Sequence, residues 1–159
     1  MTIPIRAGVL LGLLCVIWTF VMGFTAWYKD PLMLNLFFLV ILFEIAVIVW
    51  ALRKTAPEAS WGGQVVNGLT ISVVASVIIF AGSLLFTTVA FPSYFTDIQA
   101  AQTEMLKSAG LQEAEIRSQV AAAAAMQTPL MNALSGVLGT MVTGLVVAAV
   151  AGAFLRKKK

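Results

Sequence analysis

The chain has 159 residues, of which 60% are hydrophobic and only 11% are charged. Soluble domains carry about 25% charged residues, so this composition excludes an ordinary water-soluble fold. The net charge is +3, with ten basic and seven acidic residues, one cysteine and no histidine. Metal sites and base-assisted nucleophiles therefore lack their usual side chains, and we predict no metal, no cofactor and no enzymatic activity.

Four apolar stretches follow one another along the chain, and each is long enough to cross a membrane. A helix of about 20 apolar residues spans a hydrocarbon core of about 30 Å. In lipid the backbone must satisfy its own hydrogen bonds, which favours helices. We expect an all-α, polytopic protein with a single integral membrane domain over residues 1–159. The predicted spans cover residues 7–27, 32–52, 63–91 and 129–155.

Local signals mark the starts of three of these helices. Asp30-Pro31 and Thr128-Pro129 each place a good N-cap before a proline at the first helical position. They predict the starts of the second and fourth spanning helices. Ser60 is expected to open the third helix slightly before its apolar run.

The basic residues predict the orientation. Such residues concentrate on the cytoplasmic side of spanning helices, so both termini are predicted to be cytoplasmic. We expect the lipid bilayer as a partner, because these basic residues would contact anionic headgroups. Nucleic acid is not expected, because the basic residues lie in short flanks without interleaved aromatic side chains. The residues that carry this bias are Arg6, Arg53, Lys54, Arg156, Lys157, Lys158 and Lys159.

Residues 92–128 form the only sizeable segment outside the predicted spans. Apolar residues recur there at helical spacing, Gly110 is placed as a helix stop, and Glu113 and Glu115 fit the first turn of a second helix. The pattern predicts an extracytoplasmic helical hairpin between the third and fourth spans. We favour a cap that lies on the membrane surface, and the alternative is an element that docks a partner.

Glu44 is the strongest single candidate for function. It lies near the middle of the second span, where a carboxylate is costly and an ionisable residue is a functional hypothesis by default. Burial favours the neutral, protonated form. One interpretation is a proton or cation site. The other, which we favour on the sequence, is a protonated carboxyl that hydrogen-bonds across a helix interface.

The third span is rich in small polar side chains. Such residues commonly join membrane helices by hydrogen bonds, and lining a polar pathway is the less common alternative. The candidates for polar contacts between helices are Asn67, Ser72, Ser76 and Ser83.

Small residues recur every four positions in the fourth span, and a shorter version occurs in the first. This spacing lets helix backbones approach closely. It predicts packing within the chain, or self-association or docking to another membrane protein. The residues are Gly136, Thr140, Gly144, Ala148 and Gly152 in the fourth span, with Gly8 and Gly12 in the first.

The order of features resembles a known family. A serine-aromatic-glycine entry at residues 60–68, a Phe-Pro-Ser-Tyr-Phe run at 91–95 and the segment 105–116 with its acidic helix start carry the likeness. They are similar to the bacterial four-span membrane proteins classed as domain of unknown function 4199, most closely from Arg53 onward. The resemblance implies a multi-pass protein of the bacterial inner membrane. It implies no activity.

Two functions are compatible with these observations. The first is a non-enzymatic accessory or interaction subunit of a membrane complex, which would bind its partner through the outer hairpin or the small-residue face. The second is a small transporter or channel-like protein that uses Glu44 and the hydroxyl groups of the third span.

Overall fold

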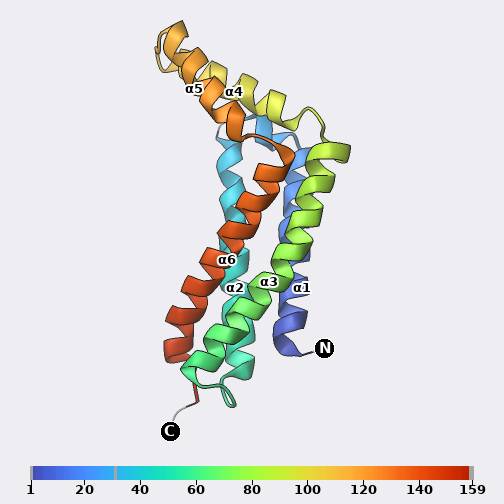
Figure 1. The fold of residues 1–159 in the computed structure, drawn as a ribbon, viewed down its shortest axis with the longest axis vertical. Helices are drawn as coiled ribbons and strands as arrows, with labels where there is room; N and C mark the ends of the chain where they lie inside the picture. The colour runs from blue at the N-terminus through green and yellow to red at the C-terminus, as the bar shows by residue number, and fades with distance from the viewer. Residues whose placement is uncertain (1, 31, 158–159) are drawn as a thin grey trace.

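The computed structural model describes residues 2–30 and 32–157, and every regular element in these residues is a helix (Figure 1). The predicted all-α fold is therefore confirmed. The elements are α1 (Ile3–Phe24), the short 3₁₀ helices η1 (Trp27–Lys29) and η2 (Met33–Phe38), α2 (Leu39–Thr55), α3 (Trp61–Leu85), the π-helical turn η3 (Phe86–Ala90), α4 (Tyr94–Ser108), α5 (Glu113–Met126) and α6 (Pro129–Phe154).

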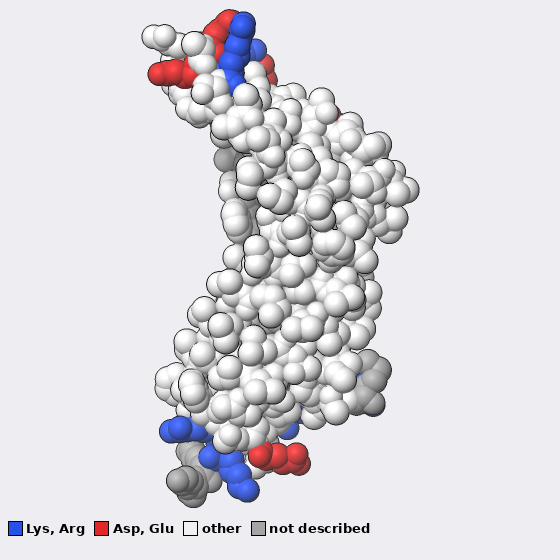
Figure 2. Space-filling view, viewed as in Figure 1, with Lys and Arg blue, Asp and Glu red and all other residues white. Residues whose placement is uncertain are grey.

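Four helical segments are long and apolar enough to cross a membrane, which confirms the multi-pass architecture. They are Ile3–Phe24, Met33–Thr55, Trp61–Ala90 and Pro129–Phe154. The α4–α5 hairpin lies at one end of this bundle, and both chain ends lie near the other (Figure 1). Charged side chains gather at these two ends and leave an uncharged band between them (Figure 2). We call the ends the hairpin end and the basic end.

Three of the local signals act as the sequence predicted. The Ser60 hydroxyl accepts a hydrogen bond from the Gly63 N–H at 3.3 Å at the start of α3. Thr128 does the same for Met131 at 3.2 Å at the start of α6. Gly110 has a φ of +79° directly after α4, a left-handed conformation that favours glycine.

The second span begins differently from the prediction. Its first turns form the 3₁₀ helix η2, and the regular α-helix starts only at Leu39. Asp30 still caps this segment, because its Oδ1 accepts a hydrogen bond from the Leu32 N–H at 2.8 Å. The Trp18 indole N–H donates to the Leu36 carbonyl at 2.9 Å and so ties η2 to α1. Pro31, Lys158 and Lys159 lie outside the described residues.

Close packing concentrates where α3 crosses α6 and α1. A Cβ atom added to Gly152 would lie 2.9 Å from the Gln64 Cβ, and one added to Gly8 would lie 2.7 Å from the Ile71 carbonyl oxygen. Gly144 similarly makes room for Ser72 of α3. The α3–α6 contact, which we call the seam, therefore depends on residues without large side chains.

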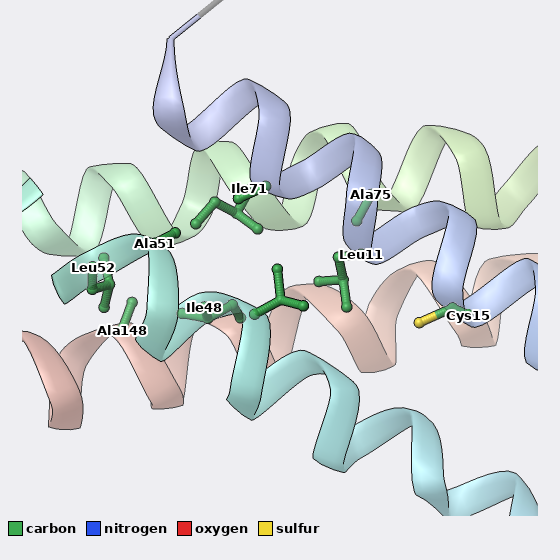
Figure 3. Close-up of a cluster of buried hydrophobic side chains, with 10 residues drawn as sticks. Leu11, Cys15, Ile48, Ala51, Leu52, Ile71, Ala75 and Ala148 are labelled. Carbon is green, nitrogen blue, oxygen red and sulfur yellow. The ribbon is translucent and has the colours of Figure 1, made fainter. Parts of the chain in front are cut away.

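Beside the seam, the basic-end half of the bundle has a continuous apolar core (Figure 3). All four spanning helices contribute to it, and its side chains are almost wholly removed from the surface. Ile48 and Leu52 of α2 fill the space between the other helices. The labelled members are Leu11, Cys15, Ile48, Ala51, Leu52, Ile71, Ala75 and Ala148.

Gln64 joins three helices at the basic end. Its side chain is fully buried, and its Nε2 donates to the Leu52 carbonyl of α2 at 2.9 Å and to the carbonyl of Leu155 after α6. Its Oε1 accepts from the Thr55 hydroxyl at 2.7 Å. Since buried amides are costly when unpaired, this network closes the bundle at that end.

We predict that G144A lowers the thermal unfolding midpoint in detergent, because a methyl group at this position overlaps the Ser72 side chain. Overpacking of this kind costs about 1–3 kcal/mol. G139A is the matched control, because nothing lies within 4 Å of a Cβ added at Gly139. Equal midpoints for both variants would contradict the proposed seam.

Candidate functional site

The hairpin-end half of the bundle contains a cavity of about 420 Å³. Glu44 lies at its deep end, near the middle of the membrane-spanning region, and Tyr94 and Asn132 lie toward the hairpin. The cavity is lined by Cys15, Val16 and Thr19 of α1, Phe37, Phe38, Val40, Ile41 and Glu44 of η2 and α2, Ile79, Gly82, Ser83 and Phe86 of α3 and η3, Tyr94 of α4, and Asn132, Ser135, Gly136, Gly139, Thr140 and Thr143 of α6.

Only one of the two carboxyl oxygens of Glu44 has a hydrogen-bond partner in the described chain. The residue is only 3% exposed, and its Oε1 accepts a hydrogen bond from the Thr140 hydroxyl of α6 at 2.6 Å. Its Oε2 is buried and has no hydrogen-bond partner among the described residues. The Thr143 hydroxyl lies close to the same carboxyl group. A buried carboxyl oxygen without a partner is unusual, because its desolvation is not compensated.

Ser76 belongs to the same polar layer. Ser72 meets Gly144 and Ile79 meets Gly136, so the antiparallel register of α3 and α6 places Ser76 opposite Thr140. The Ser76 hydroxyl is also buried without a hydrogen-bond partner in the described chain. Polar groups from α2, α3 and α6 therefore meet at one depth.

Nearer the hairpin, the cavity wall combines polar groups with aromatic rings. The Asn132 amide of α6 donates to the Ser83 hydroxyl of α3 at 2.9 Å. Phe86 and Tyr94 pack edge-on at 5.1 Å between ring centroids, and Phe20 packs on Phe86 at 5.5 Å. These packed rings form the wall of the cavity at its hairpin end.

The cavity also opens sideways. Phe38 and Ile41 line it from η2 and α2 and are exposed on the outside of the bundle, Phe38 by 66%. Ser135 and Gly139 line it from α6 and are exposed as well. These exposed lining residues place an opening of the cavity between α2 and α6, on the side of the bundle.

The other predicted residues divide between the seam and the cavity. Gly144, Ala148 and Gly152 lie in the seam, and Gly8 and Gly12 pack on α3. Gly136 and Thr140, which are also on α6, line the cavity instead. Ser83 makes a bond between helices, whereas two other candidates bond within α3: Asn67 donates to Gln64 at 3.4 Å and Ser72 to the Gly68 carbonyl at 3.1 Å.

The sequence pointed to Gln64 only as a polar residue at the start of the third span and to Thr143 only as a small residue of the fourth, and it did not single out Asn132. Their partners are on other helices, and a single sequence does not show which residues of different helices lie opposite each other. For Gln64 and Asn132, the signal in the sequence is an amide side chain inside or beside an apolar run.

The base of the α4–α5 hairpin is a second candidate site. Asp97 Oδ2 accepts hydrogen bonds from the Tyr28 hydroxyl at 2.9 Å and from Ser93 at 3.0 Å, and it pairs with the Lys29 ammonium at 3.0 Å. Burial opposes the charge of this carboxylate, but the bonds from Lys29, Tyr28 and Ser93 lower the pKa of Asp97 below its ordinary value of 3.8. The pair anchors α4 to η1.

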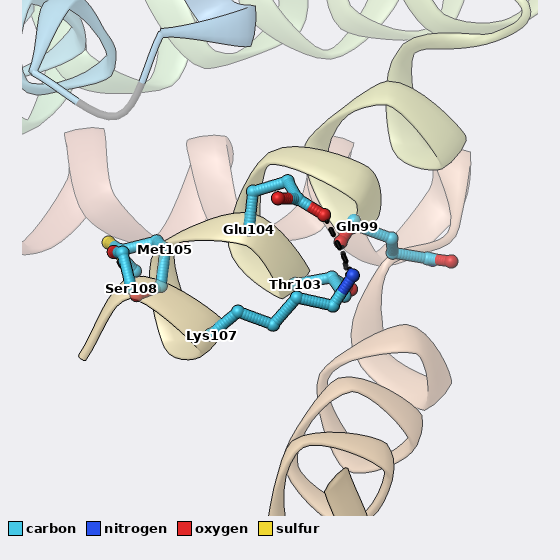
Figure 4. A network of polar contacts seen from close by, with 6 residues as sticks. All are labelled: Gln99, Thr103, Glu104, Met105, Lys107 and Ser108. Carbon is cyan, nitrogen blue, oxygen red and sulfur yellow. Dashed lines mark hydrogen bonds and ion pairs between the residues drawn. The ribbon is translucent and has the colours of Figure 1, made fainter. Parts of the chain in front are cut away.

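Beyond that base the hairpin extends sideways from the bundle (Figure 1). Gln127 joins α5 to α4 through the side chains of Gln99 at 3.0 Å and Gln102 at 3.3 Å. Near the turn, the Lys107 ammonium pairs with Glu104 at 2.9 Å, and Met105 is exposed next to Ser108 on the other side of α4 (Figure 4). This far part of the hairpin is accessible from several sides.

The described chain has no group of three or more His, Cys, Asp and Glu side chains placed to hold a metal ion.

A family profile described as "Protein of unknown function (DUF4199)" matches residues 6–157. The chain belongs to this family. Searches of curated proteins and of solved structures gave no significant match. Membership of the DUF4199 family agrees with the resemblance carried by residues 60–68, 91–95 and 105–116.

We predict that acid releases the hairpin base. Since the folded pKa of Asp97 lies below its ordinary value of 3.8, its stabilising contribution is present above that pH and is lost as the pH falls through the folded value. D97N should therefore speed hydrogen exchange of the first turns of α4 at neutral pH. E104Q near the hairpin turn is the control, and equal exchange in both variants would refute the anchor.

We also predict that T140V leaves the Glu44 carboxyl with one hydrogen-bond donor fewer. The carbonyl stretch of a protonated carboxyl rises in frequency when such a bond is lost, and infrared spectra measured against E44Q isolate this band. T70V is the control, because Thr70 is half-buried and its hydroxyl donates to the Val66 carbonyl of its own helix, away from Glu44. An unshifted band in T140V would contradict the contact.

Proposed function

We propose that this member of the DUF4199 family is a small non-enzymatic transporter or channel-like protein that uses Glu44 as an intramembrane proton or cation site. One observation carries the proposal: a buried carboxyl oxygen without a partner lies at the deep end of a cavity. An ionisable side chain within a membrane-spanning helix is a functional hypothesis by default, and here one of its oxygens lacks a hydrogen-bond partner in the described chain.

The two halves of the bundle support this proposal because they differ in packing. The basic-end half is filled by the apolar core and closed by Gln64, whereas the hairpin-end half contains the cavity. An ionisable group between a closed half and an open half is the arrangement that alternating access requires in one of its states. Movement of α2 against α6 would open the other side.

We further propose that the protein lies in the bacterial cytoplasmic membrane with both termini on the cytoplasmic side. The support is the cluster of Arg53, Lys54 and Arg156 at the basic end. The cavity would then lie in the outer half of the membrane. The non-enzymatic part of the proposal rests on the composition, which lacks histidine.

An accessory or interaction subunit is the second candidate, and the α4–α5 hairpin favours it. The hairpin is anchored at Asp97 and extends beyond the bundle with an alanine-rich, largely exposed α5. A cysteine introduced at Ser108 should cross-link to a partner in native membranes, whereas one at Val77 on the bundle surface should not. A partner recovered equally from both positions would count against docking by the hairpin.

The transporter proposal predicts a Glu44-dependent proton flux. In liposomes that contain a pH-sensitive dye, E44Q should slow the dissipation of an imposed pH gradient by about tenfold or more, because the amide cannot exchange a proton. E58Q is the control, since Glu58 is exposed in the connection between α2 and α3. Equal fluxes through wild type and E44Q would refute a proton site.

A further inference from the structure

We propose that the cavity binds a lipid-soluble organic cation in exchange for the proton carried by Glu44. This inference rests on the proposed role of Glu44 and adds the chemical class of the ligand. It follows from the charge of the lining residues, from the free carboxyl oxygen, from the aromatic wall and from the sideways opening of the cavity.

The lining favours a cation because the described residues that form it include no lysine or arginine. Its titratable groups are Glu44 of α2, Cys15 of α1 and Tyr94 of α4, and the lining residues of α3 and α6 add none. An ionised Glu44 would therefore face no positive partner in the cavity. Since an unpaired charge in hydrocarbon is costly, the carboxyl keeps its proton until a cation binds beside it.

Ligand exchange keeps the charge of the cavity constant. When the cation enters, the Glu44 carboxyl releases its proton to water and becomes the counter-ion, and the Thr140 hydroxyl still donates to Oε1. The free Oε2 then faces the positive group of the ligand. One proton leaves for each positive charge that binds, so the buried site is neutral in both states.

The shape and composition of the wall favour an organic cation over a metal ion. A volume of about 420 Å³ falls in the range of roughly 300–1,000 Å³ that is typical of drug-sized ligands. Phe37, Phe38, Phe86 and Tyr94 line the cavity, and the faces of aromatic rings attract cations and cover apolar groups. A hard metal ion would instead need several oxygen ligands at close range, and Glu44 is the one carboxylate among the described lining residues.

The route into the cavity points to a ligand that dissolves in the membrane. The opening passes between Ile41 and Phe38 on one side and Ser135 and Gly139 on the other, and all four are exposed at the surface of the bundle. A molecule with an apolar body and a delocalised charge partitions into lipid and reaches this opening. A strongly hydrated ion does not.

Tetraphenylphosphonium is a suitable probe, because it is a lipid-soluble monocation without a hydrogen-bonding group. Calorimetry on the purified protein in detergent, repeated in buffers with different ionisation heats, measures both its affinity and the protons released. We expect saturable binding with release of one proton per bound cation. E44Q should weaken binding by at least about tenfold and abolish the release, while E58Q should behave as wild type.

A second variant shows whether the probe binds in the cavity even if E44Q fails to fold. G139L places a side chain where a Cβ atom meets nothing within 4 Å, so it should fill the cavity from α6 without touching the seam. We expect it to weaken binding of the probe by at least about tenfold and to retain the infrared band of Glu44. Neutral triphenylphosphine oxide should bind weakly and release no proton.

The outcomes separate this inference from the proposed function. If tetraphenylphosphonium does not bind, or binds no better than the neutral oxide, while Glu44-dependent proton flux persists, the organic-cation inference is wrong and the proton site stands. If the flux is also independent of Glu44, both proposals fail. Binding that survives in E44Q with undiminished proton release would overturn the assignment to Glu44.

Discussion

The structure depends first on the close contact between α3 and α6. Gly68, Gly144 and Gly152 remove the side chains that would keep these helices apart, and Ala148 and Ser72 fill the space that remains. In a membrane, apolar side chains gain little by leaving lipid, so fit between surfaces and hydrogen bonds must hold helices together. Once the seam is fixed, the positions of Thr140 and Asn132 toward the cavity follow from the register.

The cavity results from the way α2 and η2 pack around α3 and α6. At the basic end, α2 lies against the seam through Ile48 and Leu52, and Gln64 bonds to α2 and to the end of α6. Toward the hairpin, α2 gives way to the 3₁₀ turns of η2, whose position is set by Trp18 of α1. The bundle is thus filled in one half and open in the other, with Glu44 at the boundary.

Most of the fold could be predicted because its signals are local. Apolar length identified the spans, and Ser60, Thr128 and Gly110 mark boundaries through bonds or backbone angles within three or four residues of themselves. The candidate site was predictable only in part. Glu44 stands out by its chemistry, but its bond to Thr140 joins positions 96 residues apart. Thr140 was predicted as a packing residue, and only the register of α2 against α6 shows it to be a hydrogen-bond donor.

The central claim is that Glu44 is a protonated carboxyl reachable from the hydrocarbon of the membrane. Dicyclohexylcarbodiimide, which dissolves in lipid and adds to protonated carboxyl groups, tests this claim most directly when the modified residue is located by mass spectrometry. The account predicts an adduct at Glu44 that fails to form with a water-soluble, charged carbodiimide and that declines as the pH is raised. Absence of the Glu44 adduct at every pH, or equal labelling by both reagents, would contradict it.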